Sequence, residues 1–172
     1  MRIERLARIV AAAAVGRTDE LPRLYREAHD AGISPADLAE ATLQVFLFAG
    51  YPRTIGAFQA LNEVAPGAAP LEPDRQDFTD RGRETFAKVY GKHAGTVMGM
   101  LEALHPDFAR YVIHDAYGQV LGRPFLPLVE RELLAVAMLA ALELPDQLKA
   151  HIRGARGAGA TEEQIELVLT QK

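Results

Sequence analysis

The chain has 172 residues, of which 49% are hydrophobic and 24% are charged, the balance of an ordinary globular protein rather than a disordered or fibrous one. This length suits one compact domain with its own core. The formal net charge of −4 is spread along the sequence without a basic stripe, so we expect no binding to nucleic acid. The chain contains no cysteine, which excludes disulfides, thiolate nucleophiles and iron–sulfur clusters.

The amino terminus and the apolar runs give no sign of secretion or of a membrane span. The longest apolar runs, VAAAAV (10–15) and LLAVAMLAAL (133–142), are shorter than the roughly 20 residues that cross a bilayer. The first segment, MRIERLARIV, mixes charges into a helical pattern and does not resemble a signal peptide. We therefore expect no contact with the membrane and a cytoplasmic location.

Hydrophobic periodicity predicts an all-α protein. Apolar residues recur every three or four positions almost throughout, as at Ile3 and Leu6, and strict strand-like alternation is never sustained. Thr18, Ser34 and Thr161 each stand before a helical pattern. Their hydroxyl groups predict three helix N-caps.

Two glycines reveal an internal repeat. Gly32 and Gly159 each follow a helical pattern and come shortly before a capping hydroxyl, which suits a left-handed turn between helices. Aligning these glycines places residues 19–44 over residues 146–171. The sequence therefore predicts a three-helix unit that is used twice.

The repeats suggest boundaries within what we expect to be one compact domain. Residues 1–64 form a degenerate first repeat, residues 65–74 are rich in Pro and Ala and read as a linker, and residues 75–172 form the second unit. Further helices are predicted near 75–90, 94–104 and 107–121. The GKHAG segment at 91–95 predicts a break between two of them.

The second repeat carries a resemblance to a known family. Residues 129–169 begin near Arg131, continue as an apolar helix and a Glu-Leu turn, and then present a His, a run of small residues and GATEEQI. This order resembles the signature region of the carboxymuconolactone decarboxylase and alkylhydroperoxidase D-like superfamily, and FAGYP near residue 50 resembles its closing segment. The resemblance implies an alkylhydroperoxidase D-like helical bundle with an internal pseudo-repeat, and a homo-oligomer, either a trimer or a hexamer.

The peroxidase branch of that superfamily uses a Glu, a C-x-x-C pair and a His. Glu132 and His151 stand at the spacing of its Glu and His, whereas Leu144 and Gln147 replace the two cysteines. The resemblance therefore implies that the proton-handling pair is retained. Thiol peroxidase activity is excluded, because no other side chain performs thiol–disulfide exchange.

His151 and Glu132 are the predicted catalytic residues. Gly154 and Ala155 follow His151 at three and four residues, so the surface beside its ring is lined by small groups. A histidine there suits a general acid or base, and Glu132 on the preceding helix would orient it. The alternatives are a histidine packed at a tight helix crossing and a glutamate in a surface salt bridge.

Three arginines near this pair are predicted to bind an anionic substrate: Arg131, Arg156 and Arg123. A guanidinium binds a carboxylate through two parallel hydrogen bonds, although solvated arginines are the ordinary alternative. The five histidines form no closely spaced ligand pair, and no glycine-rich phosphate loop follows a strand. We expect neither a metal nor a cofactor.

Two hypotheses for function follow. The first is a cofactor-independent decarboxylase or lyase that acts on a small anionic lactone or carboxylic acid. The alternative is a non-catalytic oligomeric scaffold or a small-ligand-binding member of the same superfamily. The first repeat has Arg5 and Leu24 at the positions of Glu132 and His151, so we expect one site per chain. We also expect residues 1–44 to pack against 129–171, with three aromatic side chains closing over His151: Phe46, Phe48 and Phe58.

Overall fold

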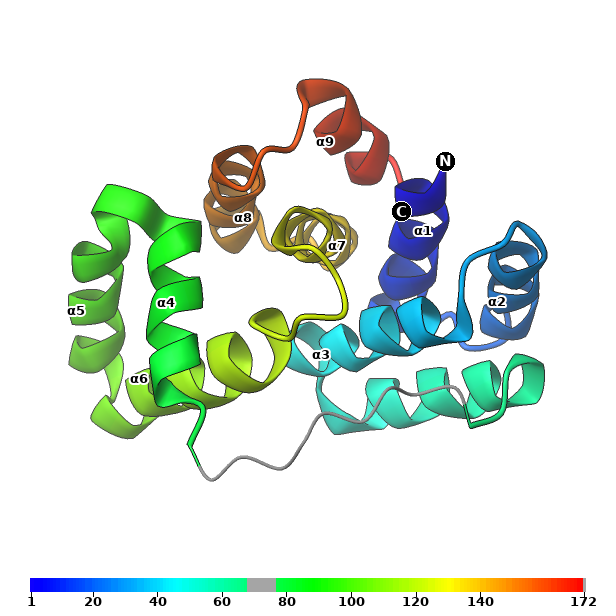
Figure 1. The fold of residues 1–172 in the computed structure, drawn as a ribbon, viewed down its shortest axis with the longest axis horizontal. Coiled ribbons are helices and arrows are strands. Elements are labelled where there is room, and N and C mark those ends of the chain that lie inside the picture. The colour runs from blue at the N-terminus through cyan, green and yellow to red at the C-terminus, as the bar shows by residue number, and fades with distance from the viewer. Residues whose placement is uncertain (68–76, 172) are drawn as a thin grey trace.

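A computed structural model describes residues 1–67 and 77–171, and these residues are built from helices (Figure 1). The expected all-α fold is confirmed. The α-helices are α1 Arg2–Val15, α2 Leu21–Asp30, α3 Pro35–Val64, α4 Thr79–Tyr90, α5 Ala94–Leu104, α6 Pro106–Tyr111, α7 Leu128–Ala141, α8 Pro145–Gly157 and α9 Glu162–Leu169. A short 3₁₀ turn, η1 Gly91–His93, and a π-helix, η2 Val112–Leu121, complete the set.

Two of the three predicted N-caps are confirmed. The Ser34 hydroxyl accepts a hydrogen bond from the Asp37 N–H, and Thr161 forms a reciprocal capping box with Gln164. The prediction that Thr18 is a helix N-cap was wrong. Residues 17–20 form a turn, and α2 begins only at Leu21, one residue before a proline that fits the first turn of a helix.

The predicted repeat is visible in the order of the helices. Gly32 has φ 86° and Gly159 has φ 100°, so both adopt the left-handed conformation expected of these turns. The helices α1, α2 and the start of α3 thus correspond to α7, α8 and α9. The expected contact between the repeats is confirmed within one chain, because α1 packs along α7 and also touches α9.

Helix α3 consists of two helices separated at Gly50. This residue has φ 71° and ψ −178°, values that interrupt the helix, and Pro52 follows in the next turn. The ribbon reverses direction there (Figure 1). Phe46 and Phe48 therefore lie on the first of these two helices, and Phe58 lies on the second.

The side chains form two hydrophobic cores. The first core lies among α1, α2, α3, α7 and α9, with members such as Leu6 and Leu134. The second core lies among α4, α5, α6 and η2, with members such as Phe86 and Tyr117. Helix α8 packs against both α7 and α4, so it joins the two cores.

The second core depends on a close crossing of α4 and η2. A β-carbon at Gly82 would collide with the Ile113 carbonyl oxygen, and one at Gly118 would collide with the Phe78 carbonyl. Glycine is therefore required for this approach of the two backbones. The predicted helix at 107–121 is confirmed as a helical segment, but most of it has the wider π geometry.

The remaining expectations concern the linker and the membrane. The predicted break at 91–95 is confirmed by η1, whereas most of the predicted linker at 65–74 lies outside the described residues. Over the described parts of the chain, every helix is too short or too polar to span a bilayer.

Candidate active site

Glu132 and His151 meet at the contact between α7 and α8. Glu132 lies in α7 directly before the apolar run that begins at Leu133 and is completely buried, and His151 is 9% exposed. The distance from His151 Nδ1 to Glu132 Oε2 is 3.0 Å. The expectation that the two side chains lie within hydrogen-bonding range is confirmed, and Glu132 is not part of a surface salt bridge.

Gly154 makes this approach sterically feasible. A β-carbon at Gly154 would stand inside the van der Waals radius of Glu132 Oε2 and 3.0 Å from Val89 Cγ1. The small residue at position 154 therefore leaves room for the carboxylate of Glu132. It also allows the side of α4 that carries Val89 to pack closely against α8.

One of the three expected aromatic side chains contacts the histidine. Phe48 meets the His151 ring edge-on, with ring centroids 5.6 Å apart. Phe46 instead packs on Tyr51 at 4.6 Å, and Phe58 packs against the first core. The prediction that all three close over the site was wrong, because Gly50 turns the chain between Phe48 and Phe58.

The carboxylate of Glu132 is only half satisfied. Its Oε1 atom is buried and has no hydrogen-bond partner among the described groups. Leaving an acceptor of this kind unpaired inside a protein is costly, and such groups often mark a functional site. Glu132 therefore retains one oxygen for a partner other than His151.

Two tyrosines whose pKa values are affected by the charge of Glu132 were not identified from the sequence. The Tyr117 hydroxyl donates to the Tyr90 hydroxyl at 2.9 Å, and both rings pack on Phe86. Burial raises the pKa of Tyr117 well above its usual value, and the nearby negative charge of Glu132 adds to the effect. Burial also raises the pKa of Tyr90. No motif pointed to either residue, and α4, which carries Tyr90, lies far from α7 in the sequence.

Arg131 and Arg123 converge on a buried glutamate. Arg123 donates to both oxygens of Glu40 at 2.7–3.1 Å, and Arg131 Nη2 donates to Glu40 Oε2 at 2.8 Å. Arg131 is fully buried, and this burial lowers its pKa. Glu40 was missed, although an acidic residue inside the apolar pattern of α3 signals a buried partner. Substrate binding by these two arginines stays a prediction, and both already hold a carboxylate of the protein.

Arg156 lies on the surface. Its Nε and Nη2 atoms donate to the two oxygens of Glu162 at 2.6 and 2.8 Å, and both side chains are exposed. The ion pair spans the turn between α8 and α9. Substrate binding by Arg156 likewise stays a prediction.

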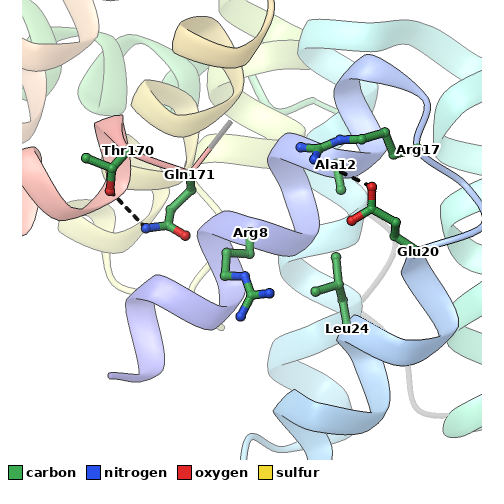
Figure 2. Close-up of a pocket in the computed structure, with 7 residues that line it drawn as sticks. All are labelled: Arg8, Ala12, Arg17, Glu20, Leu24, Thr170 and Gln171. Carbon is green, nitrogen blue, oxygen red and sulfur yellow. Dashed lines mark hydrogen bonds and ion pairs between the residues drawn. The ribbon is translucent and has the colours of Figure 1, made fainter.

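Several surface clefts lie away from the pair. A cleft of about 120 Å³ between α1, α2 and the carboxyl-terminal segment is lined by residues that include Arg8, Arg17 and Gln171 (Figure 2). Another of about 510 Å³ between α3 and η2 includes Tyr51 and Arg123. Neither cleft includes Glu132 or His151 in its lining. Within residues 1–67 and 77–171, no three His, Asp or Glu side chains gather in a way that suits a metal ion.

Known proteins with similar sequences support a family assignment. Residues 106–172 match the carboxymuconolactone decarboxylase family. The chain is 30% identical to peroxisomal protein 2 of Schizosaccharomyces pombe over 166 residues, covering 91% of this chain and 78% of that protein. It is 34% identical to 4-carboxymuconolactone decarboxylase of Acinetobacter baylyi over 91 residues, covering 52% of this chain and 68% of that enzyme. Peroxisomal protein 2 of Saccharomyces cerevisiae is 23% identical over 164 residues, 77% of this chain and 58% of that protein.

Proposed function

The chain belongs to the carboxymuconolactone decarboxylase family, and on this premise we propose that it is a cofactor-independent carboxy-lyase for a small anionic lactone or carboxylic acid. The observation that carries the proposal is the 3.0 Å contact between His151 Nδ1 and the fully buried Glu132. A buried carboxylate that orients an imidazole is the arrangement used for proton transfer at many active sites.

The chemistry needs one positioned proton. When the bond between the substrate carbon and its carboxylate breaks, carbon dioxide leaves and the electron pair remains on the substrate as a conjugated enolate. A proton from His151 Nε2 is then transferred to carbon, and the histidine regains a proton from solvent. Glu132 holds Nδ1 and stabilises the imidazolium before transfer.

The proposal is tested with 4-carboxymuconolactone, the compound in the name of the Acinetobacter baylyi relative. We expect release of carbon dioxide by the wild-type protein without added metal or cofactor. His151→Asn should lower kcat at least about 100-fold, the usual contribution of a general acid. His29→Asn, at an exposed position of α2, is the matched control and should not change kcat. Absence of turnover by the wild-type protein would contradict the proposal for this substrate.

A second candidate is a non-catalytic scaffold or ligand-binding protein. The burial of Glu132 and His151 favours it, since a packed pair is also what a structural role requires. This candidate predicts that Glu132→Gln and His151→Asn change stability or ligand affinity while no lactone is consumed. A homo-oligomer, either a trimer or a hexamer, is proposed in both cases.

For the location, the cytoplasm remains our prediction. The names of two fungal relatives point to the peroxisome as the alternative. Fractionation of cells that express the untagged protein, with a marker for each compartment, separates the two.

A further inference from the structure

The cleft between α1, α2 and the carboxyl-terminal segment brings two guanidinium groups together. It has a volume of about 120 Å³. Its wall includes the side chains of Arg8, Arg17, Ala12 and Leu24 (Figure 2). A single water molecule needs roughly 10–15 Å³ of such space, so the cleft has room for a ligand group of several atoms. Neither residue of the proposed catalytic pair lines it.

The cleft is the first repeat's counterpart of the surface beside His151. Leu24 has the position of His151 in the repeat, and Arg17 has that of Leu144. A guanidinium therefore stands in the first repeat where the second repeat carries an apolar side chain. Because the first repeat lacks the acid–base pair, a role for this cleft lies in binding rather than in proton transfer.

The two guanidinium groups have few partners of their own. Arg8 lies 3.9 Å from a carboxylate oxygen of Glu27, and Arg17 lies 3.5 Å from one of Glu20. Both distances exceed those of good charge-assisted hydrogen bonds. The Nε atom of Arg17 is buried and has no hydrogen-bond partner among the described residues. Donors that are removed from water without an acceptor cost free energy, and an anion in the cleft would supply that acceptor.

Arginines outnumber the carboxylates around the cleft. Glu27 is held more closely by Arg23, at 2.5 Å, than by Arg8. Arg23 also lies 3.8 Å from Glu20, the partner of Arg17. Three arginines therefore share two glutamates in this corner of the molecule. The positive charge in excess favours an anionic ligand.

A further arginine approaches from α3. The Arg53 guanidinium lies against Gly16 and fills the space that a β-carbon there would need. Gly16 directly precedes Arg17, so another positive charge stands next to the cleft. No carboxylate of residues 1–67 or 77–171 forms an ion pair with Arg53.

We infer that Arg8 and Arg17 bind a small oxyanion in this cleft, and that the ligand group is a phosphate. A phosphate group presents at least three acceptor oxygens, so it can accept from two guanidinium groups at once. A single carboxylate has two oxygens, and one guanidinium already engages both. Glu20 lines the same cleft, so its carboxylate opposes the binding of an anion. This site is separate from Glu132 and His151, and it does not depend on the proposed function.

The test titrates inorganic phosphate into the protein by isothermal titration calorimetry at neutral pH. Sodium chloride keeps the ionic strength constant, so that screening of the charges is equal throughout. We expect saturable binding by the wild-type protein. Arg8→Gln and Arg17→Gln should each weaken it at least about tenfold, the effect of losing one charge-assisted hydrogen bond. Acetate should bind at least about tenfold more weakly than phosphate, because it lacks the additional oxygens.

Two variants of charged residues serve as matched controls. Arg26→Gln makes the same change of charge at an exposed position of α2 outside the cleft, and it should bind phosphate as the wild type does. Glu20→Gln removes the competing carboxylate and should strengthen binding by about two- to fivefold. Circular dichroism verifies that each variant folds. The side chains of Arg8 and Arg17 are 39% and 38% exposed, and either variant decides the question if the other does not fold.

Four outcomes would overturn the inference or its ligand class. Absence of saturable phosphate binding by the wild type overturns it, and so does an equal loss of affinity in Arg26→Gln, which would mean that phosphate responds to net charge alone. Acetate that binds as tightly as phosphate overturns the ligand class. His151→Asn should retain phosphate affinity, and a loss there would mean that phosphate binds beside Glu132 instead. Failure of 4-carboxymuconolactone turnover contradicts only the proposed function.

Discussion

The carboxylate of Glu132 occupies the space that a side chain at Gly154 would need, so a glycine on α8 permits the hydrogen bond that Glu132 makes to His151. Gly154 follows His151 by three positions, about one turn of the same helix. The catalytic pair and the small residue that accommodates it are therefore set by one helix crossing.

Gly154→Ala should disable the site. The added methyl group forces the Glu132 carboxylate away from His151, with an expected loss of about 1–3 kcal/mol in the free energy of unfolding from overpacking. Activity toward 4-carboxymuconolactone should fall with it. Gly157→Ala is the control, since a β-carbon there meets nothing within 4 Å. Alanine should add about 0.5–1 kcal/mol at that helical position. Urea unfolding measures both, and equal stabilities for the two variants would contradict the steric role.

Removing only His151 should cost more stability than removing the pair. His151→Leu leaves the buried Glu132 carboxylate without its hydrogen-bond partner, an expected loss of about 3–5 kcal/mol. Combining it with Glu132→Leu removes the orphaned charge, so the double variant should be the more stable of the two. Urea unfolding of the four proteins in this mutant cycle gives the coupling. Additive effects of the two substitutions would show that the contact contributes nothing.

Glu40→Ala should be among the most damaging single changes in the chain. It leaves Arg131 fully buried without its carboxylate partner and removes the contact between Arg123 and Glu40, with an expected loss of about 3–5 kcal/mol. Glu162→Ala breaks an exposed pair with Arg156 and should change stability little, because water screens the two charges. Thermal and urea unfolding distinguish the two, and a mild effect of Glu40→Ala would mean that these arginines find other partners.

Stability should fall in alkaline solution because of buried tyrosines. Burial raises the pKa of Tyr25 and of Tyr117 above the usual value of 10.0. Below about pH 10 both the folded and unfolded phenols are neutral, whereas above it the unfolded state loses these protons first, so the free energy of unfolding decreases as pH rises. Urea unfolding between about pH 9 and pH 11 measures the slope. Tyr25→Phe should make the slope shallower, and an unchanged slope would contradict the assignment.

Self-association stays a prediction, and the structure indicates which apolar surface could support it. The apolar segments 8–15 and 133–142 pack on each other inside one chain, so they do not supply an exposed apolar face. Large apolar side chains are instead exposed on α5 and α6, among them Leu104 at 68% and Phe108 at 47%. We expect light scattering to give a trimer or hexamer, and a Leu104→Glu, Phe108→Glu variant to dissociate. A wild-type monomer at micromolar concentration would contradict this.

The amino-acid sequence by itself determined the helical class and the repeat, and its resemblance to the superfamily implied the pairing of Glu132 with His151. These depend on local signals: the periodicity of apolar residues, left-handed glycines at Gly32 and Gly159, and the fixed spacing between two consecutive helices. Glu132 and His151 lie on consecutive helices at the spacing of the superfamily's Glu and His, and the structure brings them within 3.0 Å.

The tertiary structure decided the partners that come from distant segments. Glu40 lies on α3 but binds Arg123, which precedes α7, and Arg131, which lies on α7. Val89 reaches Gly154 only because α4 packs along α8. Gly50 turned α3 back on itself and removed Phe58 from the place expected for it. Contacts of this kind depend on how whole helices pack against each other and on which buried charged side chains then meet. A local sequence pattern specifies neither the packing nor the pairing.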